Sequence, residues 1–138
     1  MTERPDPDPS SITRYIVETF DDVDVAAVEG GTFFACDPDT HWPAFATVVT
    51  SDAFDDASNL GRPGVFRVNI SVGKSTFDEV VGGAVAPDFT ALDRVMPHPV
   101  YAKQHWVCVL NPSAATFERY LRPMLAEAYA RVKRESEG

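Results

Sequence analysis

The stretch HPVYAKQHWVCVLNPSAATFERYLRPMLAEAY, residues 98–129, decides the fold. After a His-Pro turn it predicts a strand over Lys103–Leu110 and a helix that begins at Asn111-Pro112 or Ser113, which are typical start signals. Pro123 predicts a kink or a split in this helix, because proline removes one backbone hydrogen bond. Apolar residues recur at helical spacing and predict a face that packs on the core: Phe117, Leu121, Met124/Leu125, Ala128 and Val132.

The N-terminal part of the chain predicts a tail followed by a helix. Residues 1–10 are rich in Pro and Asp and predict a disordered tail, because such a segment buries little apolar area. A helix follows, for which Ser10 or Ser11 is the expected N-cap. Its apolar face is formed by Ile12, Tyr15, Ile16 and Thr19/Phe20. Residues 11–138 are therefore predicted to form a single α+β domain.

The middle of the chain predicts strands joined by short turns. Gly30-Gly31 is typical of a hairpin turn, and such short connections favour antiparallel pairing. A short helix over Phe77–Val81, capped by Ser75 or Thr76, separates the last two strands. The expected fold has two layers, a five-stranded antiparallel sheet with helices packed on one face. The five predicted strands are Val23–Val28, Thr32–Cys36, Ala44–Thr50, Val65–Val72 and Lys103–Leu110.

Composition excludes several classes of function. The formal net charge of −9, from 21 acidic and 12 basic residues, disfavours nucleic-acid binding. No apolar run is long enough to span a membrane, and residues 1–11 do not resemble a signal peptide, so we expect a cytoplasmic protein. Cys36 and Cys108 lie in apolar runs without a C-x-x-C pair, which predicts two buried thiols. We expect no cofactor and no metal.

Strand alternation points to one sheet face as a candidate site. Arg67 and Asn69 alternate with the apolar residues of their strand, and Lys103 and His105 are expected to share their face. Three residues of the last strand are assigned to the helix-packed core instead: Trp106, Cys108 and Leu110. The resulting cationic patch would bind a carboxylate, a phosphate or an acidic partner segment. The alternative is a solvated sheet face on which Arg67 pairs with a nearby Asp or Glu.

Two turns hold further candidates. In the turn His98–Tyr101, the ring of His98 either satisfies backbone groups or serves as an acid/base, and Tyr101 supplies a hydroxyl. At the loop His41-Trp42-Pro43, Trp42 is either an interaction anchor or a cap on the sheet end. A metal site of His41, Asp37 and Asp39 would need a geometry that sequence does not supply.

Several blocks resemble one family of prokaryotic proteins of unknown function, DUF6194. They are TFFACDPD, ATVVTSD, RPGVFRVNISVGKSTF, HPVYAKQHWVCVLNPS and TFERYLRPMLAEAYA, and the similarity extends over about Ile12–Val132. The resemblance implies no chemistry. A looser similarity to YjbR/MmcQ-like proteins implies a related layout of helices and strands, akin to secretion chaperones. Some of those proteins are labelled DNA-binding, which the charge of −9 here does not favour.

We therefore expect a small α+β module that binds a partner protein or a small anionic ligand through the open sheet face. The candidate ligand-binding residues are Arg67, Asn69, His98, Tyr101, Lys103 and His105. The same face is also a candidate homodimer interface. The alternative is an enzyme acting on a small polar metabolite, with His98 or His105 as acid/base.

Overall fold

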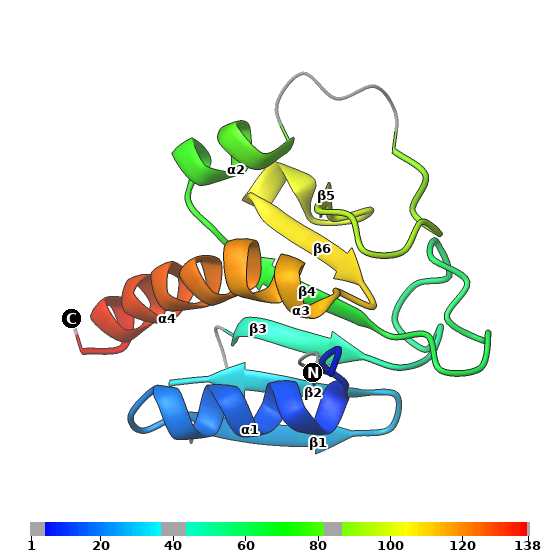
Figure 1. The fold of residues 1–138 in the computed structure, drawn as a ribbon. Coiled ribbons are helices and arrows are strands. Elements are labelled where there is room, and N and C mark those ends of the chain that lie inside the picture. Colours follow the sequence, from blue (N-terminus) through cyan, green and yellow to red (C-terminus); the bar gives the residue numbers. More distant parts are fainter. Residues whose placement is uncertain (1–4, 37–43, 82–86, 138) are drawn as a thin grey trace.

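The computed structural model describes residues 5–36, 44–81 and 87–137, and its fold is α+β (Figure 1). One antiparallel sheet of six strands has the order β1-β2-β3-β4-β6-β5. The strands are β1 (Asp24–Val28), β2 (Gly31–Ala35), β3 (Ala44–Val49), β4 (Arg67–Ser71), β5 (Met96–Pro97) and β6 (Trp106–Leu110). The antiparallel α+β prediction is confirmed, and the first four predicted strands are each present.

The sixth strand is the difference from the predicted sheet. The two-residue β5 pairs with β6 through Met96↔Cys108 and Pro97↔Val107. It lies among prolines, which argue against a strand in a sequence pattern. Proline is tolerated here because β5 is an edge strand, so the missing N–H faces no neighbour.

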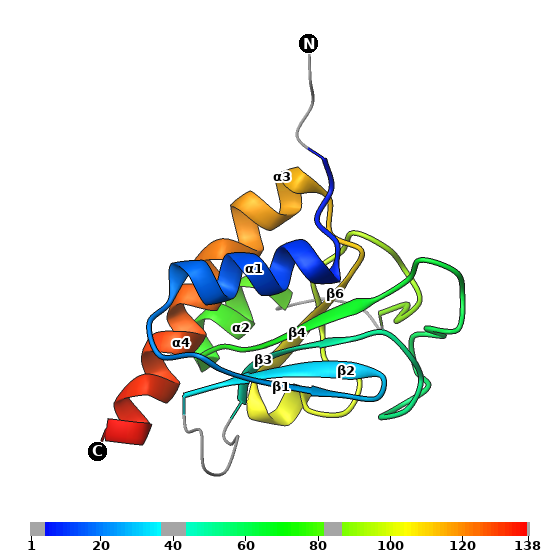
Figure 2. The same ribbon diagram turned by 90° about the horizontal axis from the view of Figure 1, so that it is seen from below.

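The helices cover one face of the sheet, and Figure 2 shows them on the side away from the long loops. They are α1 (Pro9–Thr19), α2 (Lys74–Val81), α3 (Ala114–Thr116), a π-helical turn (Phe117–Leu121) and α4 (Arg122–Glu137). Ile12 and Ile16 of α1 are fully buried beside Leu121 and Leu125, and Val68 and Ile70 meet them from β4. The predicted apolar faces of both long helices are therefore confirmed.

The start of α1 lies earlier than predicted. Asp8 is the N-cap, accepting a hydrogen bond from the Ser11 backbone N–H at 2.8 Å, and Ser11 accepts one in return from Asp8 N–H at 2.9 Å. Pro9 occupies the first helical turn, where its missing N–H costs nothing. The predicted caps Ser10 and Ser11 are thus inside the helix, and the predicted tail of residues 1–10 is too long at its C-terminal end.

The expected distortion around Pro123 takes the form of a π-helical turn. The Arg122 backbone N–H donates to the carbonyl of Phe117, five residues back, immediately before the proline. Ser113, one of the predicted caps, starts the helical run by accepting from Thr116 N–H at 3.2 Å. Phe117 and Leu121 remain buried across the turn, so the irregularity keeps both in the core.

The strand predicted over Lys103–Leu110 is wrong in its first part. Ala102–Gln104 forms a 3-10 turn, and His105 adopts a left-handed conformation with φ of 66°. Trp106 pairs with Ser71, Cys108 with Asn69 and Leu110 with Arg67, so these residues share the face away from the helices. The predicted face assignment of β6 is therefore inverted, and Val107 and Val109 lie in the helix-packed core instead.

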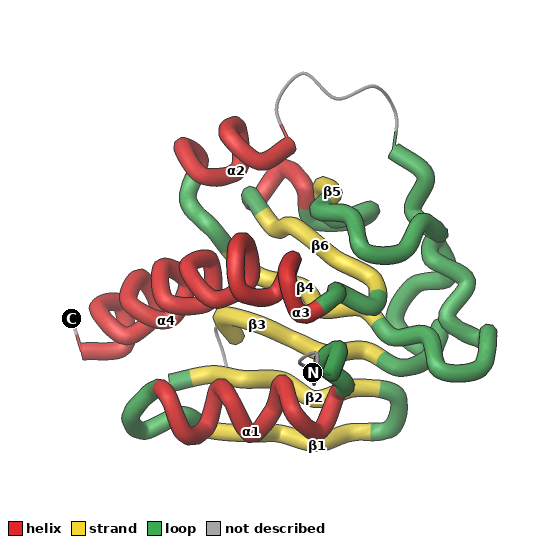
Figure 3. The backbone as a smooth tube through the Cα atoms, viewed as in Figure 1, coloured by secondary structure: helices red, strands yellow, loops and turns green. Residues whose placement is uncertain are grey.

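The predicted open sheet face is covered by loops. Residues 50–66 and 87–95 lie on this side and appear as long connections in Figure 3. A second small core lies beneath them and contains Val49, Leu60, Met96, Cys108 and Leu110. Arg62 joins the two loops, donating to the carbonyls of Ser58 at 3.0 Å and Thr90 at 3.1 Å. Both cysteines are buried, as predicted.

Replacing Gly30 by alanine is expected to lower the free energy of unfolding by about 1–2 kcal/mol, measured by chemical denaturation. Gly30 has φ of +85°, and an added Cβ would lie 2.5 Å from the Ser51 Oγ. Gly61→Ala is the matched control, because its nearest atom is 4.0 Å away and no unusual φ is required. Equal stability of the two variants would contradict this account of the β1–β2 turn.

Candidate functional site

The floor of the candidate site is formed by the loop-covered sheet face. Strand register places Phe33, Thr47 and Asn69 in one row across β2, β3 and β4. Val49 and Arg67 form the adjacent row on β3 and β4. Because side chains alternate along a strand, both rows point away from the helices. The floor is thus apolar at β2 and polar over the centre of the sheet.

Arg67 is the buried charge at the centre of this floor. Only 1% of the residue is exposed, and its guanidinium forms a bidentate ion pair with Asp55 of the loop 50–66. The Nη1–Asp55 Oδ1 distance is 3.0 Å and the Nη2–Asp55 Oδ2 distance is 2.6 Å. Nη1 also donates to Ser58 Oγ at 3.0 Å. The hydrogen bond from Arg67 lowers the pKa of the Asp55 carboxyl, although burial opposes this shift.

The hydrogen bonds continue from Arg67 along the floor. Its Nε donates to Asn69 Oδ1 at 3.0 Å, and Asn69 Nδ2 donates to Thr47 Oγ1 at 2.9 Å. In the part of the chain that the structure describes, every buried side-chain nitrogen or oxygen has a hydrogen-bond partner. The polar floor is therefore internally satisfied, and its two formal charges cancel.

His98 lies at the edge of the same floor and is 5% exposed. Its Nδ1 accepts hydrogen bonds from the backbone N–H groups of Val100 and Tyr101, both at 3.0 Å. Burial lowers the pKa of His98 to about 4, and the charge of Arg67 acts in the same direction. The ring is therefore neutral near neutral pH, with its proton on Nε2. The structural alternative predicted for His98 is present.

A cleft of about 390 Å³ opens above this floor. Its walls carry two groups of aromatic side chains. On one side Phe33 packs against Phe54 at 5.5 Å between ring centroids. On the other, the His98 ring lies 5.1 Å from Tyr101 and 6.4 Å from Trp106. A hollow of this size, with apolar walls and a few polar groups at its base, is typical of small-molecule sites.

Four of the six predicted site residues line the cleft, namely Arg67, Asn69, His98 and Tyr101. The other two do not. Lys103 is exposed in the 3-10 turn, and the His105 ring packs 5.5 Å from Phe77 of α2. The cationic patch is therefore wrong as predicted, because the turn removes two of its members and Asp55 neutralises Arg67.

Sequence reasoning missed Asp55, Phe33, Phe54 and Trp106 as cleft residues. The inverted face of β6 explains the error at Trp106, which the sequence pattern assigns to the helix-packed core. The predicted pairing of Arg67 with a nearby acid is present, although on a covered face rather than a solvated one. The polar composition of Ser51–Gly64 was the available signal that this loop could supply the acid.

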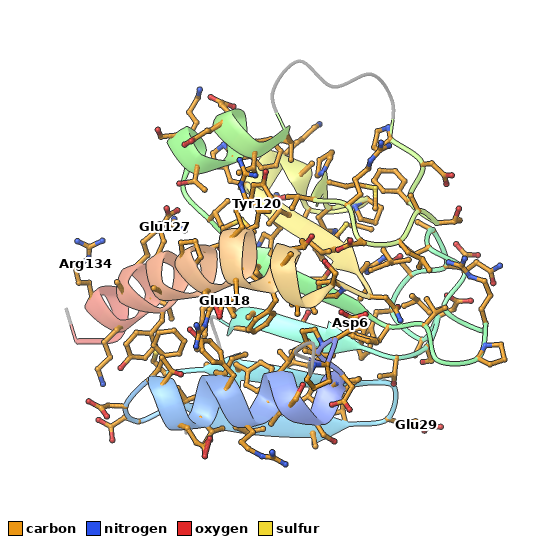
Figure 4. All side chains as sticks on the ribbon, viewed as in Figure 1. Asp6, Glu29, Glu118, Tyr120, Glu127 and Arg134 are labelled. Carbon is orange, nitrogen blue, oxygen red and sulfur yellow. The ribbon has the colours of Figure 1, made fainter. Side chains whose placement is uncertain are left out.

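A second hollow of about 610 Å³ lies between α2 and α4, on the helix side. Glu127, labelled in Figure 4, contributes to its wall and accepts from Gly73 N–H at 2.6 Å and Thr76 Oγ1 at 2.5 Å. Both of its oxygens thus hold the start of α2 against α4. The polar contacts at this hollow therefore fasten two helices together, whereas the cleft lies over the buried Arg67–Asp55 pair.

The loop candidates His41, Trp42, Asp37 and Asp39 lie outside the described residues. Within the described ranges, no three His, Cys, Asp or Glu side chains are placed to hold a metal ion. The described helices include none long and apolar enough to cross a membrane.

A protein-family model described as "Family of unknown function (DUF6194)" matches residues 7–138. The chain belongs to DUF6194. The predicted family resemblance is therefore confirmed, and it covers nearly the whole chain. No curated protein and no solved structure matches this DUF6194 chain, and the similarity to YjbR/MmcQ-like proteins stays a prediction. Its function is accordingly argued from the geometry of the cleft.

Proposed function

We propose that this DUF6194 protein binds a small molecule in the cleft above Arg67 and Asn69. The observation that carries the proposal is a buried, hydrogen-bonded polar floor beneath aromatic walls. Burying charged groups costs free energy unless each of them is paired. Well-packed hydrophobic residues would stabilise the fold at least as well as this network, so stability alone does not explain it. A satisfied network at the base of a hollow instead supports a role in presenting polar groups to a ligand.

The proposal modifies the prediction from sequence in two ways. The binding surface is a cleft between loops instead of an open sheet face, because residues 50–66 and 87–95 cover that face. A small anion is no longer the favoured ligand, since Arg67 already has a bidentate carboxylate partner. Binding of a partner protein and homodimer formation stay predictions.

The acid/base alternative has less support from the same geometry. A neutral imidazole accepts a proton at its unprotonated nitrogen, and in His98 that atom, Nδ1, already accepts two backbone N–H groups. His105 lies against α2 and does not line the cleft. Neither histidine is therefore placed as a general base toward a molecule in the cleft.

A tryptophan at the mouth of the cleft tests the proposed function. Val100 lines the cleft and is 54% exposed, so Val100→Trp is expected to obstruct it while leaving the core intact. A chemically diverse fragment set is screened by amide chemical-shift mapping on the wild type. We expect fragments to shift the amides of the cleft residues in the wild type. Their affinity should be at least about tenfold lower in the variant.

Val17→Trp is the matched control, because Val17 is 48% exposed on α1 and lies outside the cleft. It should bind the same fragments as the wild type. Fragments that shift only amides outside the cleft, or that bind Val100→Trp as tightly as the wild type, would overturn the proposed function.

A further inference from the structure

The charges lining the cleft leave no net charge for an ionic ligand. Among the described lining residues, the charged ones are Arg67 and Asp55, and they neutralise each other at 2.6 Å. An anion would have to displace Asp55 from a guanidinium that is 1% exposed. A cation would meet the same paired guanidinium without an unpaired carboxylate beside it. Both would lose hydration without a free counter-charge.

His98, at the edge of the floor, supplies a hydrogen-bond donor for which no partner is found among the described residues. With Nδ1 occupied by two amides, the ring carries its hydrogen on Nε2, at the opposite edge. No described residue accepts a hydrogen bond from Nε2. In the described chain, no buried side-chain nitrogen lacks a hydrogen-bond partner. The Nε2 atom is therefore accessible, and because His98 lines the cleft we infer that its N–H faces the cleft. A donor that faces the cleft without a protein partner favours a hydrogen-bond acceptor on the ligand.

The walls favour a flat ligand. Phe33 lies on β2 and Trp106 on β6, with β3 and β4 between them, a separation of three strand spacings or roughly 14 Å. Aromatic side chains on both sides offer ring faces and edges to a planar molecule. A cleft of about 390 Å³ has room for one or two rings.

We propose that the ligand is an uncharged, planar compound whose carbonyl-type acceptor receives the hydrogen bond from His98 Nε2–H. This inference rests on the proposed function, because it names the class of molecule that the same cleft binds. It differs from a general binding role in that it predicts how affinity changes with the charge of otherwise similar ligands.

Three planar probes of the same shape test the inference, namely benzamide, benzoate and benzamidinium. Each is titrated into the wild-type protein near neutral pH, with affinities taken from amide chemical shifts of the cleft residues. We expect benzamide to bind at least about tenfold more tightly than either ion. Its carbonyl accepts the hydrogen bond from Nε2–H, whereas each ion loses its hydration in a cleft that offers no free counter-charge.

His98→Asn isolates the donor. Asparagine Oδ1 can replace Nδ1 as the acceptor for the Val100 and Tyr101 amides, but it removes the Nε2–H from the cleft. Benzamide affinity should fall about tenfold, while the fold remains intact by the dispersion of the amide spectrum. Val17→Trp again serves as the control with unchanged affinity.

The outcomes separate the inference from the proposed function. Tighter binding of benzoate or benzamidinium at the cleft would overturn the uncharged ligand class and leave small-molecule binding in place. Equal benzamide affinity in His98→Asn would overturn the role of Nε2–H. If the diverse fragments map to the cleft and benzamide does not, the inference fails alone. If neither maps there, both fail.

Discussion

Arg67→Ala is expected to lower the free energy of unfolding by about 3–5 kcal/mol, because it leaves a buried charge without its partner. Asp55 would lose both hydrogen bonds from the guanidinium, and Ser58 Oγ and Asn69 Oδ1 would each lose a donor. The Asp55 side chain is 14% exposed, so water replaces the guanidinium only in part. Urea unfolding near neutral pH measures the change.

An exposed ion pair provides the control for this prediction. Lys74 and Asp78 are 75% and 57% exposed, and Lys74→Ala should leave the unfolding midpoint unchanged. If Arg67→Ala does not fold, Arg67→Lys keeps the charge but loses the bidentate geometry, and it should show a smaller loss in the same direction. A loss below about 1 kcal/mol for Arg67→Ala would contradict the assigned burial of the pair.

A double-mutant cycle shows how much of the loss belongs to the pair itself. Removing both charges in Arg67→Met with Asp55→Ala leaves no buried ion, so the double variant should be more stable than Arg67→Met alone. The coupling energy between the two sites is expected to be at least about 1 kcal/mol, since they are in direct contact. Strict additivity would mean that loop 50–66 is held mainly by its other contacts, among them Arg62.

The helices and the first four strands could be predicted because their patterns are regular. The helical spacing of Leu121 and Leu125, and the alternation of Val68 and Ile70 with polar residues, each reflect burial on one face of one element. Such patterns report a local period. They do not report what covers the other face, because loops are built from polar and turn residues whose packing has no period.

The errors at β6 come from one turn. His105 has φ of 66° at the end of the 3-10 turn, so the extended backbone of β6 begins only after it. The predicted alternation of side chains between the two faces includes Lys103 and His105, which precede the strand. A slip of one residue sends every side chain to the opposite face. The sequence pattern therefore assigns Trp106 and Cys108 to the helix side, although they pair with Ser71 and Asn69 and share the loop-covered face with them. The left-handed His105 had no signal in its residue type strong enough to predict the break.

The candidate site was predicted in part for a related reason. Arg67 and Asn69 were found because a polar pair inside an apolar strand is unusual on either face. Asp55 was missed because it is far along the chain in a loop with several carboxylates, among them Asp52 and Asp56. Which carboxylate reaches Arg67 depends on how loop 50–66 packs on the sheet through Leu60. This packing is tertiary structure and has no local sequence pattern.

Acidification should destabilise the protein through His98 before the Asp55 carboxylate, which is paired with Arg67, is affected. The pKa of His98 is about 4 in the folded chain, below its ordinary value of 6.5. Between these two values the unfolded chain binds a proton that the folded chain does not, so the free energy of unfolding falls as pH falls. Above 6.5 both states are neutral and His98 contributes nothing to the pH dependence. The Asp55 pKa is lowered from 3.8, so its stabilisation is lost only at still lower pH.

His98→Asn is expected to remove this pH dependence, because asparagine keeps an acceptor for the turn and does not titrate. Relative to the variant, the wild type should lose about 2–3 kcal/mol of unfolding free energy between about pH 7 and about pH 4.5. Urea unfolding of both proteins across this range measures the difference, and taking the difference cancels the effects of the other titrating groups. Parallel curves for the wild type and His98→Asn would show that the imidazole is accessible to protons in the folded chain, and that its Nδ1 is not held by the Val100 and Tyr101 amides.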